Sequence, residues 1–358
     1  MRRTYIIAEA GVNHNGSLDL ALQLVDKAVE AGADAVKFQT FRADEMVTKR
    51  AGKAEYQTAL TDPEESQWAM LKSLELGEAA HHRLIEYCKQ CGIDFISTPF
   101  DVGSVDLLAG SFDLPILKIS SGDITNGPLL MKAAASGKKV ILSTGMSTLG
   151  EIEQALAVLA FGYTRTQDTP SISAFFRAYS SEHGQRILRE NVILLHCTSE
   201  YPCPFDEVNL RAMQTLGQAF QLPVGLSDHT PGIAVPIAAA ALGAVVIEKH
   251  FTLDRGLPGP DHQASIEPDE LKRMVESIRQ VEQALGSPVK VATPAESKNK
   301  LLVRKSLVAR SEIRAGDVFS ESNLTVKRPG DGVSPMHYWD YLGRSAARTY
   351  APDEQVTE

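Results

Sequence analysis

The chain of 358 residues has little cysteine and no long apolar run. Its four cysteines are Cys88, Cys91, Cys197 and Cys203. The start, "MRRTYIIAEAG", has too short an apolar run for an export signal. No stretch reaches the roughly 18 apolar residues that cross a bilayer. We therefore expect a cytoplasmic protein with reduced thiols and no membrane contact.

The chain also lacks an excess of basic residues. Lys and Arg number 36 against 45 Asp and Glu, so the formal net charge is −9. This balance argues against non-specific binding to nucleic acid or to an anionic membrane surface. A small anionic substrate stays possible, because a few local lysines can oppose the overall sign.

One cysteine pair has the spacing of a redox or zinc motif. The segment "CKQC" (88–91) lies in a helix-like stretch that ends at Gly92. No second pair has zinc-site spacing, so we expect these cysteines to be structural.

Short apolar runs are abundant. Eight of them lie at residues 5–10, 34–40, 94–100, 116–121, 140–145, 192–199, 224–229 and 245–250. Such runs are typical of parallel strands buried on both faces, and the amphipathic stretches between them predict helices. One helix should begin after the cap residue Ser17 and end near Gly32.

Eight strand–helix units predict a TIM barrel, with a doubly wound open sheet as the alternative. We favour the barrel because polar residues follow all eight apolar runs. Only a closed barrel brings eight strand ends to one mouth.

The domain boundaries follow from changes in composition. We expect the barrel over residues 1–285, a polar, lysine-rich linker over 286–300 and a small β-rich domain over 301–358. Two long segments, 41–77 and 161–190, interrupt the barrel repeat, and the second has room for an extra helix.

Polar residues at the strand ends predict a site at the barrel mouth. Lys37 and Lys118 lie in apolar strands, where a charge is costly unless it meets anions. Hydroxyl groups near two ammonium groups describe a pocket for phosphate or carboxylate. The full set of strand-end residues is Glu9, Lys37, Gln39, Thr98, Lys118, Ser120, Ser121, Ser143, Thr144, Thr198, Ser199, Ser227, Asp228, His229, Glu248 and His250. Taken singly, each hydroxyl is more often a turn or capping residue.

Two histidines end neighbouring apolar runs, in "GLSDHT" (225–230) and "AVVIEKHF" (244–251). His229 and His250 can therefore converge on one metal ion and leave positions open for water and substrate. The alternative is a pair of hydrogen-bonded structural histidines. Strand alternation turns Asp228 away from His229, so Asp228 is predicted to support the ligands from behind or to hold the loop, and not to bind the metal itself.

Several motifs together carry a family resemblance: "IIAEAGVNHNGS", "AVKFQTF", "FISTPFD", "LKISSGDITN", "ILSTGMS", "LLHCTSEYP", "GLSDHT", "IEKHFTLD" and "GPDH". With them the chain resembles the sialic acid synthase family, whose relatives include legionaminate and pseudaminate synthases. The end of the chain resembles the SAF fold of type III antifreeze proteins. The resemblance implies a transferase that condenses phosphoenolpyruvate with an N-acetylated aldose. The products are a nonulosonic acid and phosphate, formed by C–O cleavage.

The resemblance ranks N-acetylmannosamine first as the sugar, giving N-acetylneuraminate. The alternative is a 2,4-diacetamido-trideoxyhexose, giving legionaminate or pseudaminate. A divalent metal is also implied, with Mn²⁺ first and Mg²⁺ or Co²⁺ as alternatives.

Carried over by motif, the resemblance implies roles for particular residues. The metal ligands are His229 and His250, and the catalytic residues are Glu9, Lys37 and Lys118. Phosphoenolpyruvate is held by Lys37, Thr98, Lys118, Ser121, Ser143 and Ser227, and the sugar by Glu9, Gln39, Tyr201 and Asp261. Ser199 and Asp123 occupy substrate-binding positions where relatives often have Asn and Glu. Whether Glu9 is an acid–base group or only positions the sugar stays open.

The resemblance also implies a homodimer with an exchanged SAF module. In that arrangement Arg328 of "VKRPG" reaches the active site of the partner subunit.

Two rival functions remain. A Schiff-base aldolase would use Lys37 or Lys118 as the nucleophile and need no metal. A binding protein is suggested by the antifreeze-like module, although Lys327, Arg328 and Asp331 make that segment too charged for an ice-binding face.

Overall fold

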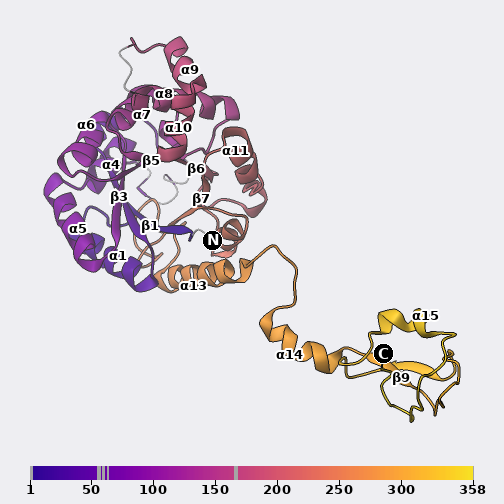
Figure 1. Cartoon of the computed structure of the whole chain (residues 1–358). Helices are drawn as coiled ribbons and strands as arrows, with labels where there is room; N and C mark the ends of the chain where they lie inside the picture. Colours follow the sequence, from indigo (N-terminus) through magenta and orange to yellow (C-terminus); the bar gives the residue numbers. More distant parts are fainter. Residues whose placement is uncertain (1–2, 55–57, 59–60, 63, 165–167, 358) are drawn as a thin grey trace. The chain divides into compact units, whose positions relative to one another are not determined.

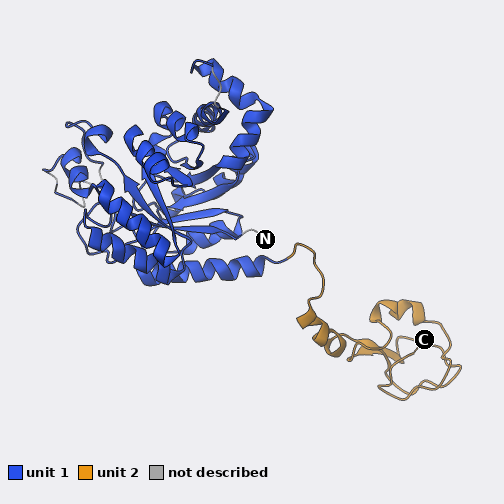
Figure 2. Cartoon of the chain, turned by 60° about the vertical axis from the view of Figure 1, so that its left-hand side comes forward, with its two compact units in different colours: residues 1–286 blue, residues 287–358 orange. Residues whose placement is uncertain are grey.

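Two compact units, Met1–Gly286 and Ser287–Glu358, make up the chain in the computed structural model (Figure 2). The structure describes residues 3–54, 58, 61–62, 64–164 and 168–357. Among these residues, no helix combines the length and the apolar character needed to cross a bilayer.

Eight parallel strands form the centre of the first unit (Figure 1). They are β1 (Tyr5–Gly11), β2 (Ala35–Thr40), β3 (Asp94–Pro99), β4 (Ile116–Ile119), β5 (Lys139–Ser143), β6 (Val192–Cys197), β7 (Val224–Asp228) and β8 (Val246–His250). They are hydrogen-bonded in the order β3-β2-β1-β8-β7-β6-β5-β4. Since β3 also contacts β4, the ring is nearly closed. The predicted TIM barrel is thus confirmed over the open sheet.

Helices surround the strands. The main ones are α1 (Leu18–Ala31), α5 (Glu78–Cys91), α7 (Gly127–Ala135), α8 (Leu149–Thr164), α10 (Glu182–Asn191), α11 (Ala212–Phe220), α12 (Ala234–Ala241) and α13 (Pro268–Leu285). Helix α1 has the predicted ends: the Ser17 side chain accepts a hydrogen bond from the Leu20 N–H, and Gly32 has a left-handed φ of 78°. A continuous apolar core lies between these helices and the strands.

Shorter elements decorate the barrel. They are α2 (Ala43–Met46), α4 (Gln67–Leu74), α6 (Val102–Val105), the π-helical turn η1 (Asp106–Ser111), the 3₁₀ turns η2 (Ser121–Asp123) and η3 (Phe205–Glu207), and α9 (Ile172–Ser180). Helix α9 confirms the extra helix predicted in segment 161–190. The "CKQC" segment ends α5, where Gly92 adopts the left-handed conformation and Cys88 is a buried free thiol, as expected for structural cysteines.

The second unit is small and mostly irregular. It contains α14 (Pro294–Val303), the antiparallel pair β9 (Ser306–Ala309) and β10 (Leu324–Lys327), the 3₁₀ turn η4 (Pro335–His337) and α15 (Tyr338–Tyr341). Helix α14 begins inside the segment predicted as linker, because Thr293 and Glu296 form a capping box. A separate apolar cluster that includes Leu307, Phe319 and Tyr350 forms the core.

Candidate active site

An apolar layer inside the barrel supports the polar residues of the mouth. Ile7, Ala35, Ile96, Ile141, Leu195 and Val246 form one buried cluster. Successive side chains of a strand point to opposite faces, so the residue two positions further on each strand also points inward. Those residues are Glu9, Lys37, Thr98, Ser143, Cys197 and Glu248. The barrel is therefore filled by apolar side chains below and lined by polar ones above.

The polar residues enclose a cavity of about 430 Å³ at the carboxyl ends of the strands. Most of the residues predicted for the site line it: Glu9, Lys37, Gln39, Thr98, Lys118, Ser121, Ser143, Ser199, Tyr201, Ser227, His229 and His250. The structure confirms that the strand-end residues Ser120 and Glu248 also line it, and it adds Ala54, Gln67, Phe100, Gly122, Met146 and Cys197. Within the described chain, no lining residue comes from segment 161–190.

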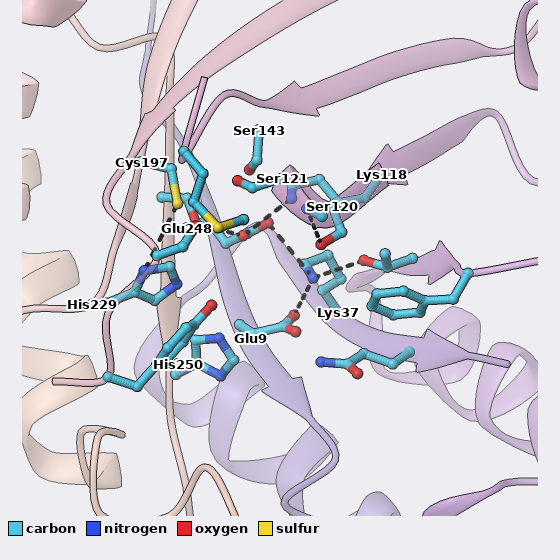
Figure 3. Close-up of a pocket in the computed structure, with 18 of the residues that line it drawn as sticks. Glu9, Lys37, Lys118, Ser120, Ser121, Ser143, Cys197, His229, Glu248 and His250 are labelled. Atoms are coloured by element: carbon cyan, nitrogen blue, oxygen red, sulfur yellow. Dashed lines mark hydrogen bonds and ion pairs between the residues drawn. The ribbon is translucent and has the colours of Figure 1, made fainter. Parts of the chain in front are cut away.

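Lys37 lies at the centre of a buried network of charges (Figure 3). Its Nζ is 2.7 Å from Oε2 of Glu9 and 3.7 Å from Oε2 of Glu248. It also donates a hydrogen bond to Oγ1 of Thr98 at 3.0 Å. Burial alone would lower the pKa of Lys37, but the two glutamates raise it above its ordinary value. Lys37 is therefore held as a cation, which suits anion binding better than nucleophilic attack.

Glu248 is among the predicted strand-end residues, but the sequence assigned it no role in the site. Its Oε1 accepts a hydrogen bond from Ser227 at 2.8 Å and lies 3.5 Å from Nζ of Lys118. It thus lies between the two lysines. Burial raises the pKa of Glu248, but Lys118 and Lys37 lower it more, so the carboxylate stays ionised. The inward alternation from Val246 to Glu248 to His250 is the sequence signal that identifies it.

The pKa of Glu9 is shifted in the opposite direction to that of Glu248. Burial raises its pKa to about 7, although Lys37 opposes the shift. Lys118 is also affected by burial, which lowers its pKa while Glu248 opposes the change. The cavity therefore contains a cationic Lys37, an ionised Glu248 and a Glu9 whose proton is exchangeable near neutral pH.

Hydroxyl groups line the side of the cavity near β4, β5 and β6. Gly145 donates its N–H to Oγ of Ser121 at 3.0 Å. A Cβ atom at Gly145 would lie 2.3 Å from Oγ of Ser199, so a side chain there would displace the hydroxyl of Ser199. Oγ of Ser143 is buried without a hydrogen-bond partner. A buried polar group without a partner is costly, which indicates that a ligand atom completes the site.

The two predicted histidines lie together on the opposite side of the cavity from these hydroxyls (Figure 3). The ring centroids of His229 and His250 are 5.4 Å apart. The ring of Tyr201 packs against both, at 4.1 Å from His229 and 5.7 Å from His250. Nδ1 of His229 lies 2.7 Å from the carbonyl oxygen of Thr198, so Nδ1 carries the proton and Nε2 is left for a metal.

The histidine pair fits a metal of the kind that the family resemblance implies. Nδ1 of His250 is buried without a hydrogen-bond partner and lies 3.9 Å from Oδ2 of Asp261. Burial, helped by the neighbouring His229, lowers the pKa of His250 well below its ordinary value, so the ring is neutral as a ligand must be. Burial also lowers the pKa of His229, but the Cys197 thiol beside its ring raises it more. In the described parts of the chain, no three His, Cys, Asp or Glu side chains converge on one point, so water and substrate would complete the coordination.

Four other residues of interest lie outside the cavity lining. Asp123 turns back along η2 and accepts a hydrogen bond from Asn126 at 3.0 Å. Asp261 lies behind His250, while His262 is held by Thr252 at 2.7 Å and does not reach the cavity. Arg328 follows β10 in the second unit and is exposed.

The fold is a TIM barrel, and its mouth holds buried lysines, carboxylates and a pair of histidines, as in barrel enzymes whose site lies at the carboxyl ends of the strands. Comparison with known proteins then gives the family. Residues 24–290 match the NeuB family and residues 304–358 match the SAF domain, so the chain belongs to the NeuB family and carries a C-terminal SAF domain.

Individual relatives agree with this assignment. An N,N'-diacetyllegionaminic acid synthase of Campylobacter jejuni is 52% identical over 358 residues, which are 100% of both chains. An enzyme of the same name from Legionella pneumophila is 46% identical over 95% of this chain and 89% of its own. The crystal structure of an N-acetylneuraminic acid synthetase from Leptospira borgpetersenii has a TM-score of 0.66 and 36% identity, covering 83% of this chain and 90% of that one.

These identities change the expected ranking of products. The sequence motifs rank N-acetylneuraminate synthase first and legionaminate or pseudaminate synthase second. The two legionaminic acid synthases are 52% and 46% identical to the chain, against 36% for the sialic acid synthetase. The identities therefore favour the legionaminate alternative over the N-acetylneuraminate product that the motifs rank first.

Proposed function

We propose that this protein condenses phosphoenolpyruvate with a 2,4-diacetamido-trideoxyhexose to form a legionaminate-type nonulosonic acid and phosphate. The observation that carries the choice of sugar is the 52% identity, over the full length of both chains, to a diacetyllegionaminic acid synthase. The cavity supports the other substrate, because two buried lysines and the unpaired hydroxyl of Ser143 suit a phosphate and a carboxylate.

Lys37, Lys118 and the hydroxyls of Thr98, Ser121 and Ser143 would hold phosphoenolpyruvate. The arriving anion would favour the protonated form of Glu9, whose pKa burial already raises to about 7. Glu9 could then donate a proton to the sugar oxygen that becomes negative as the new C–C bond forms. In this proposal Glu248 stays ionised and keeps the two lysines charged and oriented.

His229 and His250 would hold the divalent cation, for which we propose Mn²⁺. Such an ion supplies Lewis-acid polarisation of the sugar carbonyl. Gln39, Tyr201 and Asp261 would contact the sugar. Ser199 lines the cavity and would make a further contact to substrate. Asp123 is given no direct contact, because it is bound to Asn126 and does not face the cavity.

We further propose that the enzyme is a homodimer in which the SAF domain of one subunit contributes Arg328 to the mouth of the other. The support is the SAF match over residues 304–358 and the exposure of Arg328. An exposed guanidinium is available to pair with a substrate carboxylate or a sugar hydroxyl.

A substrate panel tests the proposal. Phosphate release is followed with phosphoenolpyruvate, Mn²⁺ and one sugar at a time, and the product is identified by mass spectrometry. We expect kcat/KM for the diacetamido sugar of the legionaminate series to exceed that for N-acetylmannosamine by about ten-thousandfold, as for a site built to hydrogen-bond an extra polar group. The His229→Ala variant serves as the blank for contaminating phosphatase. A preference for N-acetylmannosamine, or for the pseudaminate isomer, would refute the assignment.

A further inference from the structure

A buried ion pair lies behind the two histidines, on the face of the barrel wall turned away from the cavity. Nζ of Lys249 is 2.5 Å from Oδ2 of Asp228, and the two side chains are 0% and 1% exposed. The residues are also register partners across β7 and β8. His229 follows one partner directly and His250 follows the other, so the ion pair joins the two strands one residue before both rings.

The ion pair also fixes the backbone on both sides of His229. The Lys249 ammonium donates to the carbonyl oxygen of Thr230 as well as to Asp228. Thr230 folds back in turn, because its Oγ1 donates to Oδ1 of Asp228 at 2.9 Å and its N–H donates to the same oxygen at 3.2 Å. Asp228 and Thr230, on either side of His229, are thus both bound to Lys249, the residue before His250.

The opposite face of the same junction carries a second link. Ser227 and Glu248 are also register partners, and their side chains are hydrogen-bonded at 2.8 Å inside the cavity. This inner link is open to ligand, whereas the outer one is sealed from solvent. Replacing a buried ion pair with apolar groups is often neutral or stabilising, so stability alone gives weak grounds for keeping one here.

We propose that Asp228 and Lys249 are positioning residues that set the separation and orientation of the His229 and His250 rings for metal binding. This inference rests on the two-histidine metal centre of the proposed function. It assigns a task to a charged pair that touches neither substrate nor cavity. Residues that support metal ligands from behind typically change metal affinity by about ten- to a hundredfold when they are replaced.

Metal binding without turnover tests the inference. The Asp228→Asn/Lys249→Met variant removes the link between the strands, leaves no unpaired charge and keeps an acceptor for Thr230. Free Mn²⁺ is measured by electron paramagnetic resonance during titration of metal-free protein. We expect the Kd for Mn²⁺ to rise about tenfold or more, while phosphoenolpyruvate binding in the absence of metal is unchanged. A folded double variant with a Kd within about twofold of wild type would overturn the inference.

Matched variants separate positioning from general stability. Thr40 forms a buried polar link on the other side of the barrel, at 2.6 Å from Oγ of Ser97 and 2.7 Å from Nε2 of His81. Thr40→Val should lower the Tm without changing the Mn²⁺ Kd; an equal loss of metal affinity would contradict positioning. If the double variant does not fold, Thr230→Val keeps the ion pair, removes the hydrogen bonds from Oγ1 of Thr230 to Asp228 and should weaken Mn²⁺ binding in the same direction. An unchanged Kd there would count against the inference.

The His229→Ala variant distinguishes failure of the proposed metal centre from failure of the positioning role alone. If it binds Mn²⁺ as wild type does, the metal centre itself is wrong and the positioning role falls with it. If it loses Mn²⁺ while the double variant keeps it, only the positioning role is wrong.

Discussion

The barrel mouth and the C-terminal unit bury opposite kinds of side chain. At the mouth, Glu9, Lys37, Lys118 and Glu248 are each between 1% and 3% exposed. In the described part of the C-terminal unit, Ser306 is the single buried polar residue, and charged residues such as Arg328 lie at the surface. Burying a charge is costly, and a small unit has little core with which to offset that cost.

The two units therefore differ in how they present charge to a ligand. The large apolar framework of the barrel holds charges that are only partly satisfied by one another and that gain from a ligand. The C-terminal unit is stable as an apolar cluster and offers charge from its surface. We therefore expect substitutions at the mouth to act mainly on chemistry, and substitutions in the C-terminal unit to act on access and on the sugar.

The largest effect is expected from the histidine pair. His229→Ala or His250→Ala removes half of the proposed protein ligand set, so turnover should fall by at least about a thousandfold at micromolar Mn²⁺. Steady-state phosphate release measures the loss. Because both rings line a cavity, the circular dichroism spectrum and the Tm should change little.

A third strand-end histidine provides the control. His196 lies on the neighbouring strand β6, and its Nε2 contacts the carbonyl oxygen of Val208 at 2.6 Å instead of lining the cavity. His196→Gln should reduce stability and leave Mn²⁺-dependent turnover within about threefold of wild type. Full activity of His229→Ala, or a His196→Gln enzyme as inactive as His229→Ala, would contradict the metal assignment.

Much of the mouth follows from the sequence, because strands buried on both faces show as apolar runs and their polar ends mark one rim. The inward alternation even predicts which residues form the ring. Asp228 was expected to hold its loop, and its bonds to Thr230 confirm this.

The features that the sequence did not reveal depend on the pairing register of the strands and on how far long side chains extend. The pairing of Asp228 with Lys249 requires the β7–β8 register, which no local pattern encodes. The place of Glu248 between Lys37 and Lys118 depends on how far three long side chains extend across the barrel. Asp123 was expected to bind substrate, but the turn η2 directs it to Asn126.

The next effect concerns His14, a buried histidine in the loop between β1 and α1. His14 is 1% exposed and accepts a hydrogen bond from the Gly16 N–H at 3.0 Å. Burial, helped by the charges of His81 and His262, lowers its pKa to about 4 from 6.5. Below pH 6.5 the unfolded chain takes up a proton that the folded ring refuses, so stability is lost as the pH falls from about 6.5 to about 4. At pH 5 this amounts to about 2 kcal/mol.

Each unit contains one of the two tryptophans, Trp68 and Trp339, so the Trp339→Phe and Trp68→Phe backgrounds report urea unfolding of the barrel and of the C-terminal unit respectively. We expect the barrel to lose stability between pH 7 and pH 5, with about 2 kcal/mol of the loss due to His14. His14→Asn keeps an acceptor for Gly16 and should reduce the loss by that amount. The C-terminal unit serves as the internal control, since its histidine, His337, is exposed. An equal pH dependence in wild type and variant would show that His14 is not the responsible group.

The smallest effect tests whether the C-terminal unit takes part in the chemistry. Arg328→Ala should raise the KM for the sugar about tenfold and leave the KM for phosphoenolpyruvate unchanged, as for one lost charged hydrogen bond. Lys327→Ala is the matched control, because Lys327 is the adjacent exposed cation and already pairs with Asp353. An unchanged sugar KM in the Arg328 variant would remove the C-terminal unit from the site.

Mixing the inactive His229→Ala variant with the impaired Arg328→Ala variant then decides which subunit supplies Arg328. A dimer of one His229→Ala subunit and one Arg328→Ala subunit has an intact barrel in the second subunit and an intact C-terminal unit in the first. If the units are exchanged, these two parts meet, and equal mixing at low sugar should restore about a quarter of the wild-type rate. If each C-terminal unit serves its own barrel, no complete site forms and the mixture shows only the mean rate of its two parents. Restoration would therefore show that the barrel mouth of one subunit receives Arg328 from the surface of the other subunit.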